Sequence, residues 1–324
     1  MEVSTRDRVS EQPSPKTAVR PRLSIVVLSW NTQQLLRECL TSVEAQRPPF
    51  EIEVLVVDNA SHDGSADMVE KEFPWARLIR NDRNEGYSRG NNIGIAAATG
   101  DAVLLLNSDT VILGDALQRL VHFAESHPEY GAVGCQLINP DGSIQRACHR
   151  FPTLLTALFF DTIFERLWKK NPILHHYFMR DWDHADSRVV DQPPGAALLI
   201  PRRVIEEVGV LDEGLPIFFN DVDFCLRLRE HGYRVFFLAE ARIIHHVGQS
   251  TKQLQDFPVT YTTNRIAFYR KYYGWFGGVY LKGIAILRGL EVAFEILRRR
   301  KKLDADCRGE LAHISATLGK ILRS

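Results

Sequence analysis

Short apolar segments recur along the first 135 residues, and each is followed by a segment with helical periodicity. Leu23–Leu28, Ile52–Val57 and Ala102–Leu106 are rich in aliphatic residues without polar–apolar alternation, as is typical of strands buried on both faces. Leu78-Ile79 marks a further short strand between them. Alternating strands and helices predict an α/β fold with a parallel, doubly wound sheet.

The remaining helices and strands are predicted from the same patterns of apolar residues. Residues 148–192 are irregular and aromatic, and residues 256–324 are expected to be helical to the end. Helices are expected at residues 35–43, Ser65–Phe73, Gly90–Ala98, Ala116–Ser126, Leu154–Leu167, Arg203–Val208 and Val222–His231, and strands at Ala196–Ile200, Val235–Leu238 and Arg242–Ile244.

Three regions are expected. Residues 1–21 are polar and rich in Pro, Ser and charge, which predicts a disordered tail, and they lack the apolar core of a signal peptide. Residues 22–255 hold the α/β domain, and residues 256–324 a helical appendage. The most apolar helical segment, Tyr272–Leu297, is interrupted by four charged residues, so we expect amphipathic helices rather than a membrane span. The five scattered cysteines are expected to be reduced, so we expect a cytoplasmic protein.

The distribution of charged residues limits which partners the sequence predicts. The 40 basic residues balance the 40 acidic ones, so no nucleic-acid partner is expected. A basic run at Arg298–Lys302 follows aromatic residues such as Trp275 and Phe276. This pair of features is typical of a contact with the inner face of a membrane, and equally of helices packed on the main domain. The sequence leaves both open.

Polar residues directly follow three of the predicted strands. Ser29-Trp30-Asn31, Asp58-Asn59 and Asn107-Ser108-Asp109 follow the first, second and fourth strands. Each alone is an ordinary turn or cap, but ligands in open α/β sheets bind at the carboxyl ends of strands. Asp58 can accept from a base N–H or a ribose hydroxyl. A carboxylate such as Asp109, together with substrate phosphates, is sufficient for Mg²⁺ or Mn²⁺.

Three further segments carry candidate chemistry. Asn84–Asn92 is a Gly-containing loop that enters a helix with Arg89, a pattern that suits a diphosphate and also a plain turn. Asp221 and Asp223 begin a helix, where one carboxylate can act as a general base and the other can favour the helix dipole. The doublet His245-His246 ends a short strand, and either histidine could ligate a metal.

Taken together, the motifs resemble family 2 glycosyltransferases with the GT-A fold, in the rhamnosyltransferase-like branch. The matching segments, which keep the family's order over residues 22–255, are LSIVVLSWN (23–31), VVDNASHDGS (56–65), NEGYSRGNNIG (84–94), LLLNSDT (104–110), GAALLI (195–200), VGVLD (208–212), FFNDVDFCLR (218–227) and IHHVGQS (244–250).

The resemblance implies an inverting, metal-dependent enzyme that moves a sugar from a nucleotide diphosphate to a glycan or lipid-linked acceptor in cell-surface polysaccharide synthesis. Rhamnose from dTDP-rhamnose is the expected donor, with UDP-sugars as the alternative. The implied roles are Asp221 as catalytic base; Ser29, Asn31, Asp58, Asn59, Arg89, Asn107, Ser108 and His245 in donor binding; Asp109 and His245 as metal ligands; and Gly195, Ala196 and Asp223 on the acceptor side.

Two positions depart from the family pattern. Asn107 replaces the first carboxylate of the metal motif, which lowers the local negative charge, and Asn220 stands where many relatives have Glu. A nucleotidyltransferase would need a Gly-rich loop after the first strand, where this chain has Ser29–Thr32. A catalytically silent nucleotide-sugar-binding module is the other alternative, and the presence of Asp109 and Asp221 argues against it.

Overall fold

The computed structural model describes residues 22–248, 254, 256–299 and 305–323. The strands are β1 (Leu23–Ser29), β2 (Ile52–Asp58), β3 (Arg77–Arg80), β4 (Ala102–Asn107), β5 (Thr110–Ile112), β6 (Tyr130–Ile138), β7 (Arg188–Val190), β8 (Ala197–Pro201) and β9 (Arg234–His245). The helices are α1 (Gln33–Glu44), α2 (Ser65–Glu72), α3 (Gly86–Ala97), α4 (Ala116–Ser126), α5 (Leu154–Phe159), α6 (Ile163–Leu167), α7 (Pro172–Tyr177), α8 (Arg202–Val208), α9 (Asn220–Glu230), α10 (Phe257–Arg299) and α11 (Ala305–Arg323). The expected disordered tail, residues 1–21, lies outside the described residues.

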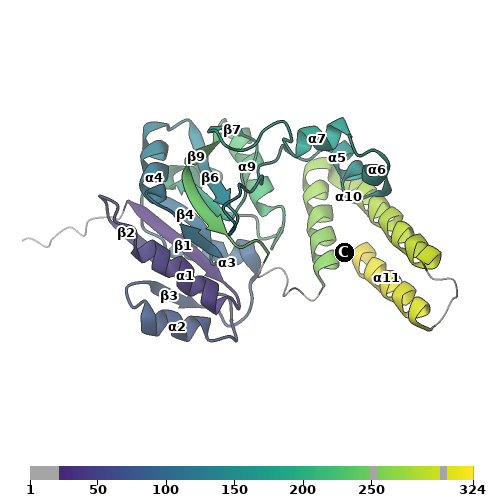
Figure 1. The fold of residues 1–324 in the computed structure, drawn as a ribbon, viewed down its shortest axis with the longest axis horizontal. Helices are drawn as coiled ribbons and strands as arrows, with labels where there is room; N and C mark the ends of the chain where they lie inside the picture. Colours follow the sequence, from purple (N-terminus) through teal and green to yellow (C-terminus); the bar gives the residue numbers. More distant parts are fainter. Residues whose placement is uncertain (1–21, 249–253, 255, 300–304, 324) are drawn as a thin grey trace, which may run out of the picture.

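The strands form one mixed, mostly parallel sheet flanked by helices, in agreement with the expected α/β class. Its order is β3-β2-β1-β4-β8-β6-β9-β5, and β7 pairs with β9. The pairs β1–β2, β1–β4, β2–β3 and β6–β9 are parallel, whereas β8 runs antiparallel to both β4 and β6. The ribbon shows this sheet as one body, with α10 and α11 to its side (Figure 1).

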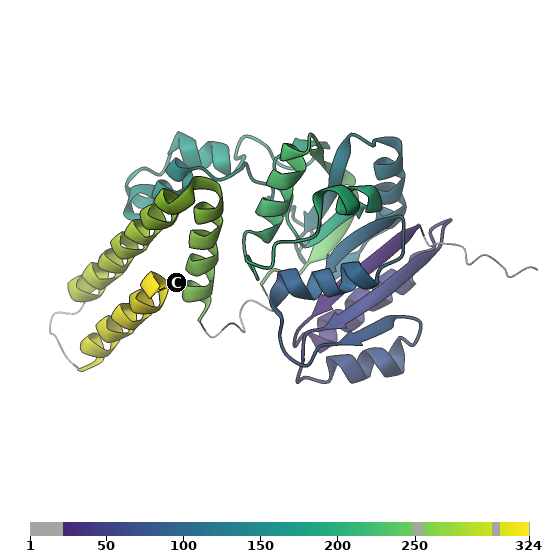
Figure 2. The ribbon, with the colours of Figure 1, turned by 180° about the vertical axis from the view of Figure 1, so that it is seen from behind.

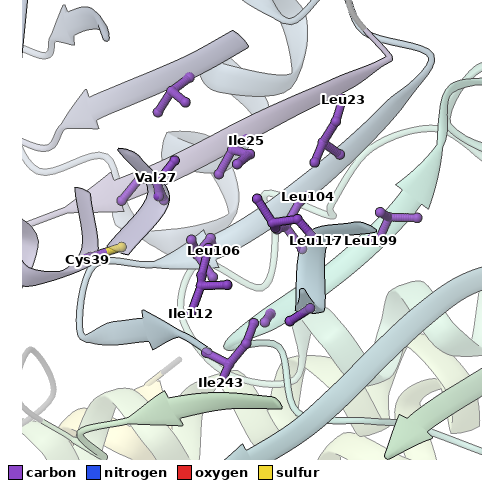
Figure 3. Close-up of a cluster of buried hydrophobic side chains, with 14 of the residues drawn as sticks. Leu23, Ile25, Val27, Cys39, Leu104, Leu106, Ile112, Leu117, Leu199 and Ile243 are labelled. Atoms are coloured by element: carbon purple, nitrogen blue, oxygen red, sulfur yellow. The ribbon is translucent and has the colours of Figure 1, made fainter. Parts of the chain in front are cut away.

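Apolar side chains on both faces of the sheet make two cores. Leu23, Ile25 and Val27 of β1 pack on one face with residues of α1 and α4 such as Cys39 and Leu117 (Figure 3). The intervening β1 residue Val26 faces the other core, which α3, α8 and α9 cover (Figure 2). Because both faces of these parallel strands are buried, their sequences are unbroken runs of apolar residues.

Two local expectations were wrong. Val235–Leu238 and Arg242–Ile244 are parts of a single strand, β9, whose pairing with β6 shifts register between Cys135 and Gln136. The extra residues 239–241 bulge there, and the bulge masks the strand pattern. The segment Leu154–Leu167 is also not one helix, because the chain breaks between α5 and α6.

The C-terminal region forms two long helices, as expected. Helix α10 bends sharply at Gly274, whose φ of 62° is readily accessible to glycine, and α11 packs alongside its second half (Figures 1 and 2). Within the described ranges, no helix combines the length and apolar character needed to cross a bilayer. Of the cysteines, Cys39, Cys135, Cys148 and Cys225 are buried free thiols, and burial raises the pKa of Cys39 to about 12.

Candidate active site

A cavity of about 590 Å³ opens at the carboxyl ends of β1 and β4. Its wall includes residues to which the resemblance gave catalytic, metal-binding, donor-binding and acceptor-side roles. Those residues are Asn59, Asn107, Ser108, Asp109, Gly195, Ala196, Asp221 and His245. Segments from residue 59 to residue 245 thus meet at one sheet edge, and the volume lies within the roughly 300–1,000 Å³ typical of small-molecule sites.

Strand register explains how the turns come together. Leu28 pairs with Asn107, and Ser29 pairs with Asp58, so the ends of β2, β1 and β4 are neighbours. Asp58 itself is 3% exposed and does not line the cavity wall. Its Oδ2 accepts from the Ser61 N–H at 3.0 Å, while its buried Oδ1 has no partner in the described part of the protein. An unpaired buried acceptor costs free energy, so this oxygen is suited to a donor group supplied by a ligand.

Ser29 is buried and Asn31 partly buried, and neither residue lines the cavity. The Ser29 hydroxyl hydrogen-bonds the Thr32 hydroxyl at 3.1 Å, and Asn31 Oδ1 accepts from the His62 N–H at 2.7 Å. Asn31 adopts a φ of 52°, a left-handed conformation that asparagine tolerates better than most residues. These two residues therefore shape the turn around Trp30, whose side chain belongs to the cavity lining.

Asn59 lines the cavity, but its amide group is already engaged. Its Oδ1 accepts from Asn81 Nδ2 and from the Glu85 N–H, both at 3.0 Å. Its Nδ2 donates to Asn84 Oδ1 at 2.8 Å and to the Gly86 carbonyl at 3.1 Å. Asn59 thus fixes the loop that leads into α3.

The first turn of α3, for which the sequence left a diphosphate site and a plain turn open, makes hydrogen bonds within the protein. The N–H groups of Tyr87 and Ser88 both donate to the Pro216 carbonyl, at 2.6 and 3.0 Å. Arg89 is half-exposed, pairs with Glu213 at 3.3 Å and does not line the cavity. The first turn therefore holds the loop around Pro216, and its donors are not free for an anion.

Asp109 and His245 form the polar centre of the cavity. Residue Thr110 of β5 pairs with His245 of β9, which brings His245 Nε2 to 3.5 Å from Asp109 Oδ1. His245 Nδ1 lies 3.1 Å from Gln145 Oε1, a contact that suits the Nδ1–H tautomer and leaves Nε2 free to ligate. The neighbouring His246 instead donates its backbone N–H to the Asp109 carbonyl at 2.9 Å. Of the doublet, His245 lines the cavity and His246 does not.

These donors fit a hard divalent cation. Among the described residues, no group of three or more His, Cys, Asp or Glu side chains is arranged to hold a metal. Asp109 and His245 provide one carboxylate oxygen and one imidazole nitrogen, and Asn107 lines the cavity beside them. Mg²⁺ commonly takes only one or two protein carboxylates and completes its shell with phosphate oxygens and water. The set therefore fits a metal that is held jointly with a diphosphate.

Asp221 lies at the start of α9 on the same cavity wall. Phe219, which precedes the helix, has a φ of 66°, and such strain in a non-glycine residue concentrates at functional sites. Asp221 Oδ1 accepts from the Val222 N–H at 2.9 Å, and burial raises the pKa of the Asp221 carboxyl. A Cβ added to Gly195 would lie 3.3 Å from Asp221 Oδ2, so glycine leaves room for this carboxylate.

Asp223, for which the resemblance implied a place on the acceptor side, does not line the cavity. Its side chain is fully buried. Oδ2 accepts from Arg227 Nε at 2.9 Å, and Oδ1 accepts from the Tyr272 hydroxyl at 2.8 Å and pairs with Lys271. The two carboxylates are two residues apart on the helix, so they point to nearly opposite sides, and Asp223 joins α9 to α10.

Several cavity residues were missed from the sequence. Tyr87 donates its hydroxyl to the Gly195 carbonyl at 2.8 Å, and burial lowers the pKa of His149 to about 4. Asn264 of α10 acts from outside the cavity, since its Oδ1 accepts from the N–H groups of Ile217 and Phe218 at 3.2 and 3.3 Å. The pattern Thr263-Asn264-Arg265 within an apolar helix was the available signal.

Comparison with known proteins identifies similar sequences. Residues 24–184 match the family model described as glycosyl transferase family 2. The chain is 31% identical, over 72% of its length, to the O-antigen biosynthesis protein RfbC of Myxococcus xanthus, but spans only 18% of that protein. It is 27% identical to the N-acetylglucosaminyl-diphospho-decaprenol L-rhamnosyltransferase of Mycobacterium tuberculosis, over 71% of this chain and 77% of that one.

Two solved structures share the fold. The mannosyltransferase PcManGT from Pyrobaculum calidifontis, in complex with GDP-Man and Mn²⁺, aligns with a TM-score of 0.53 and 15% identity over 94% of this chain and 87% of that one. GalNAc-T7 with UDP, GalNAc and Mn²⁺ aligns with a TM-score of 0.52 and 16% identity over 70% of this chain and 43% of that one. At this identity the likeness supports the architecture.

Proposed function

The chain belongs to glycosyl transferase family 2, and on that premise we propose that it is an inverting, metal-dependent enzyme that transfers a sugar from a nucleotide diphosphate to a glycan or lipid-linked acceptor. The observation that carries the proposal is the single cavity that brings Asp109 and His245 together with Asp221. A metal-binding pair suits the departing diphosphate of a single displacement at a sugar carbon, and a carboxylate base suits the attacking hydroxyl.

Asp109 and His245 would hold Mg²⁺ or Mn²⁺, with Gln145 fixing the orientation of the histidine ring. When bound, the metal would stabilise the negative charge that develops on the departing diphosphate. Asn107 bears no charge, so Asp109 is the one carboxylate available to the metal on the turn after β4.

Asp221 would remove the proton from the acceptor hydroxyl. The acceptor oxygen forms a bond to the anomeric carbon while the bond from that carbon to the diphosphate oxygen breaks. Because one displacement occurs, the configuration at the anomeric carbon inverts. A raised pKa makes this carboxylate a stronger base than an exposed aspartate, which favours proton removal near neutral pH.

Asp58 would bind the nucleotide. Its unpaired, buried Oδ1 suits the N3–H of a uracil or thymine base or a ribose hydroxyl. Rhamnose from dTDP-rhamnose is the preferred donor, with UDP-sugars as the alternative. The similarity to a mycobacterial L-rhamnosyltransferase supports rhamnose as the sugar.

We further propose that the enzyme works at the cytoplasmic face of a membrane. Trp275, Phe276 and Val279 after the bend in α10 are 77%, 57% and 46% exposed, and such exposed apolar side chains can enter a lipid surface. Leu281, further along the same helix, is buried and does not belong to this exposed group. The basic residues 300–302 lie outside the described residues. Trp275→Glu should reduce co-sedimentation with anionic liposomes, and an unchanged bound fraction would remove the membrane contact.

A panel of nucleotide sugars tests the central proposal. Thermal shifts with and without Mn²⁺ or Mg²⁺ should identify the donor, and Asp109→Ala should abolish the part of donor affinity that depends on metal. Donor affinity that stays the same when a chelator is added would contradict the metal role of Asp109. A transfer assay with the identified donor then tests turnover directly, and the product's anomeric configuration tests inversion.

A further inference from the structure

A second cavity, of about 420 Å³, lies between α10 and α11. Apolar side chains dominate its lining: Leu281, Ile284, Ala285 and Val292 come from α10, and Ile314 and Leu318 from α11. The two helices and α5–α7 form the body to the side of the sheet (Figures 1 and 2). Such a lining suits a hydrocarbon chain rather than a sugar or nucleotide.

A buried cation interrupts this apolar lining. Arg265 is 8% exposed and lines the cavity, yet among the described residues it forms no ion pair with a carboxylate. Its Nη2 donates a hydrogen bond to the Ala157 carbonyl at 3.0 Å, and its guanidinium carbon lies 5.5 Å from the centroid of the Phe160 ring. Arg288, on the same cavity, is balanced by Asp161 at 3.6 Å and Glu291 at 3.3 Å. A buried, unbalanced guanidinium is costly unless an anion joins it.

The second cavity adjoins the catalytic one. Tyr261 lines the second cavity, and its ring centroid lies 5.3 Å from that of Phe218 and 5.7 Å from that of Phe219. Both phenylalanines line the catalytic cavity. Tyr177 is affected by charged groups of both cavities. Burial raises its pKa, the positive charge of Arg265 lowers that pKa, and the negative charge of Asp221 raises it. A group bound at Arg265 is thus separated from the catalytic cavity by one aromatic layer.

We propose that the cavity between α10 and α11 binds the hydrocarbon chain of a lipid phosphate, with Arg265 as the partner of the phosphate. The inference rests on the proposed function and deepens it, because it makes the acceptor a sugar joined through phosphate to a lipid. The apolar lining takes the chain, the guanidinium takes the anion, and the sugar beyond the phosphate lies toward Asp221. A bidentate guanidinium–phosphate contact would also balance the buried charge.

Binding of three probes to the full chain tests the inference without any need for turnover. Farnesyl phosphate carries both chemical features, farnesol carries the chain alone, and inorganic phosphate carries the anion alone. Isothermal titration should show farnesyl phosphate binding at least about tenfold more tightly than either of the others, because charge-assisted hydrogen bonds add to apolar burial. Equal affinity for farnesol and farnesyl phosphate would overturn the role of Arg265.

Two variants separate the chain from the phosphate. Arg265→Gln should reduce the preference for farnesyl phosphate over farnesol by about tenfold, since a neutral amide makes weaker bonds to phosphate. Thr317→Trp adds bulk at a partly buried position on the cavity wall and should weaken binding of both lipids. Ser315→Trp, at an exposed position on the same helix that does not line the cavity, is the matched control and should bind both as the native chain does.

The outcomes also distinguish this inference from the proposed function. Donor binding at the catalytic cavity, measured by thermal shift on the same preparation, tests the enzyme independently. A chain that binds its donor but neither lipid overturns the inference and leaves the glycosyltransferase proposal standing. If the affinity for farnesyl phosphate is unchanged in both Arg265→Gln and Thr317→Trp, the inference is also overturned. If Arg265→Gln fails to fold, the comparison of Thr317→Trp with Ser315→Trp decides.

Discussion

Replacement of Asp221 by asparagine is expected to change activity and stability in opposite directions. Asparagine has the same shape, and its Oδ1 can still accept from the Val222 N–H at 2.9 Å, so the start of α9 should be retained. The amide cannot accept a proton from the acceptor hydroxyl. Loss of a general base typically costs about 10²–10⁴ in rate, or about 2.7–5.4 kcal/mol in activation free energy.

The stability effect follows from the pKa of Asp221. Burial raises the folded-state pKa above the usual 3.8, so the folded protein binds this proton more tightly than the unfolded chain. The resulting stabilisation is fully present below the unfolded pKa and is lost as the pH rises through the folded pKa. At neutral pH the ionised carboxylate therefore destabilises the fold, by about 1.4 kcal/mol for each unit of the shift. Asparagine carries no charge and avoids this cost.

Thermal denaturation and transfer kinetics together test this reasoning. Asp221→Asn should melt higher than the native chain at neutral pH, and the difference should shrink as the pH is lowered toward about 4. Turnover should fall while donor affinity stays the same. Asp223→Asn is the contrasting variant, because it weakens the contacts with Arg227 and Lys271 and should lower the melting temperature. Native-like turnover of Asp221→Asn, or a lower melting temperature at neutral pH, would refute the assignment.

Four other substitutions are expected to separate direct from indirect roles. Gln145→Ala should weaken metal affinity by about 10–100-fold, measured by metal titration of donor binding, and native affinity would exclude its orienting role. Asn264→Ala should lower turnover more than donor affinity, because it releases the loop before α9; the reverse ratio would contradict this. Asp58→Leu should weaken binding of the free nucleotide, and isothermal titration showing no loss would reject the contact. Arg89→Ala should change donor affinity by less than about fivefold, since exposed ion pairs contribute about 0–1 kcal/mol; a larger loss would restore its predicted role.

The strand pattern of the sequence anticipated much of the sheet, and its failures have local causes. β1, β2 and β4 were visible because both of their faces are buried, so their apolar runs are continuous. β9 was read as two strands because residues 239–241 form a bulge opposite β6. The antiparallel insertion of β8 could not be read from its sequence, because a buried strand has the same composition in either direction.

The motifs by themselves determined the family, the α/β architecture and the candidate residues at the strand ends. Only the tertiary structure decided which of those residues face the cavity. Asp221 and Asp223 are two positions apart, yet the turn of the helix sends one to the cavity and the other to Lys271. The physical reason is that composition and local periodicity specify elements, whereas the direction of a polar side chain depends on partners distant in the chain, such as the Gln145 that orients His245.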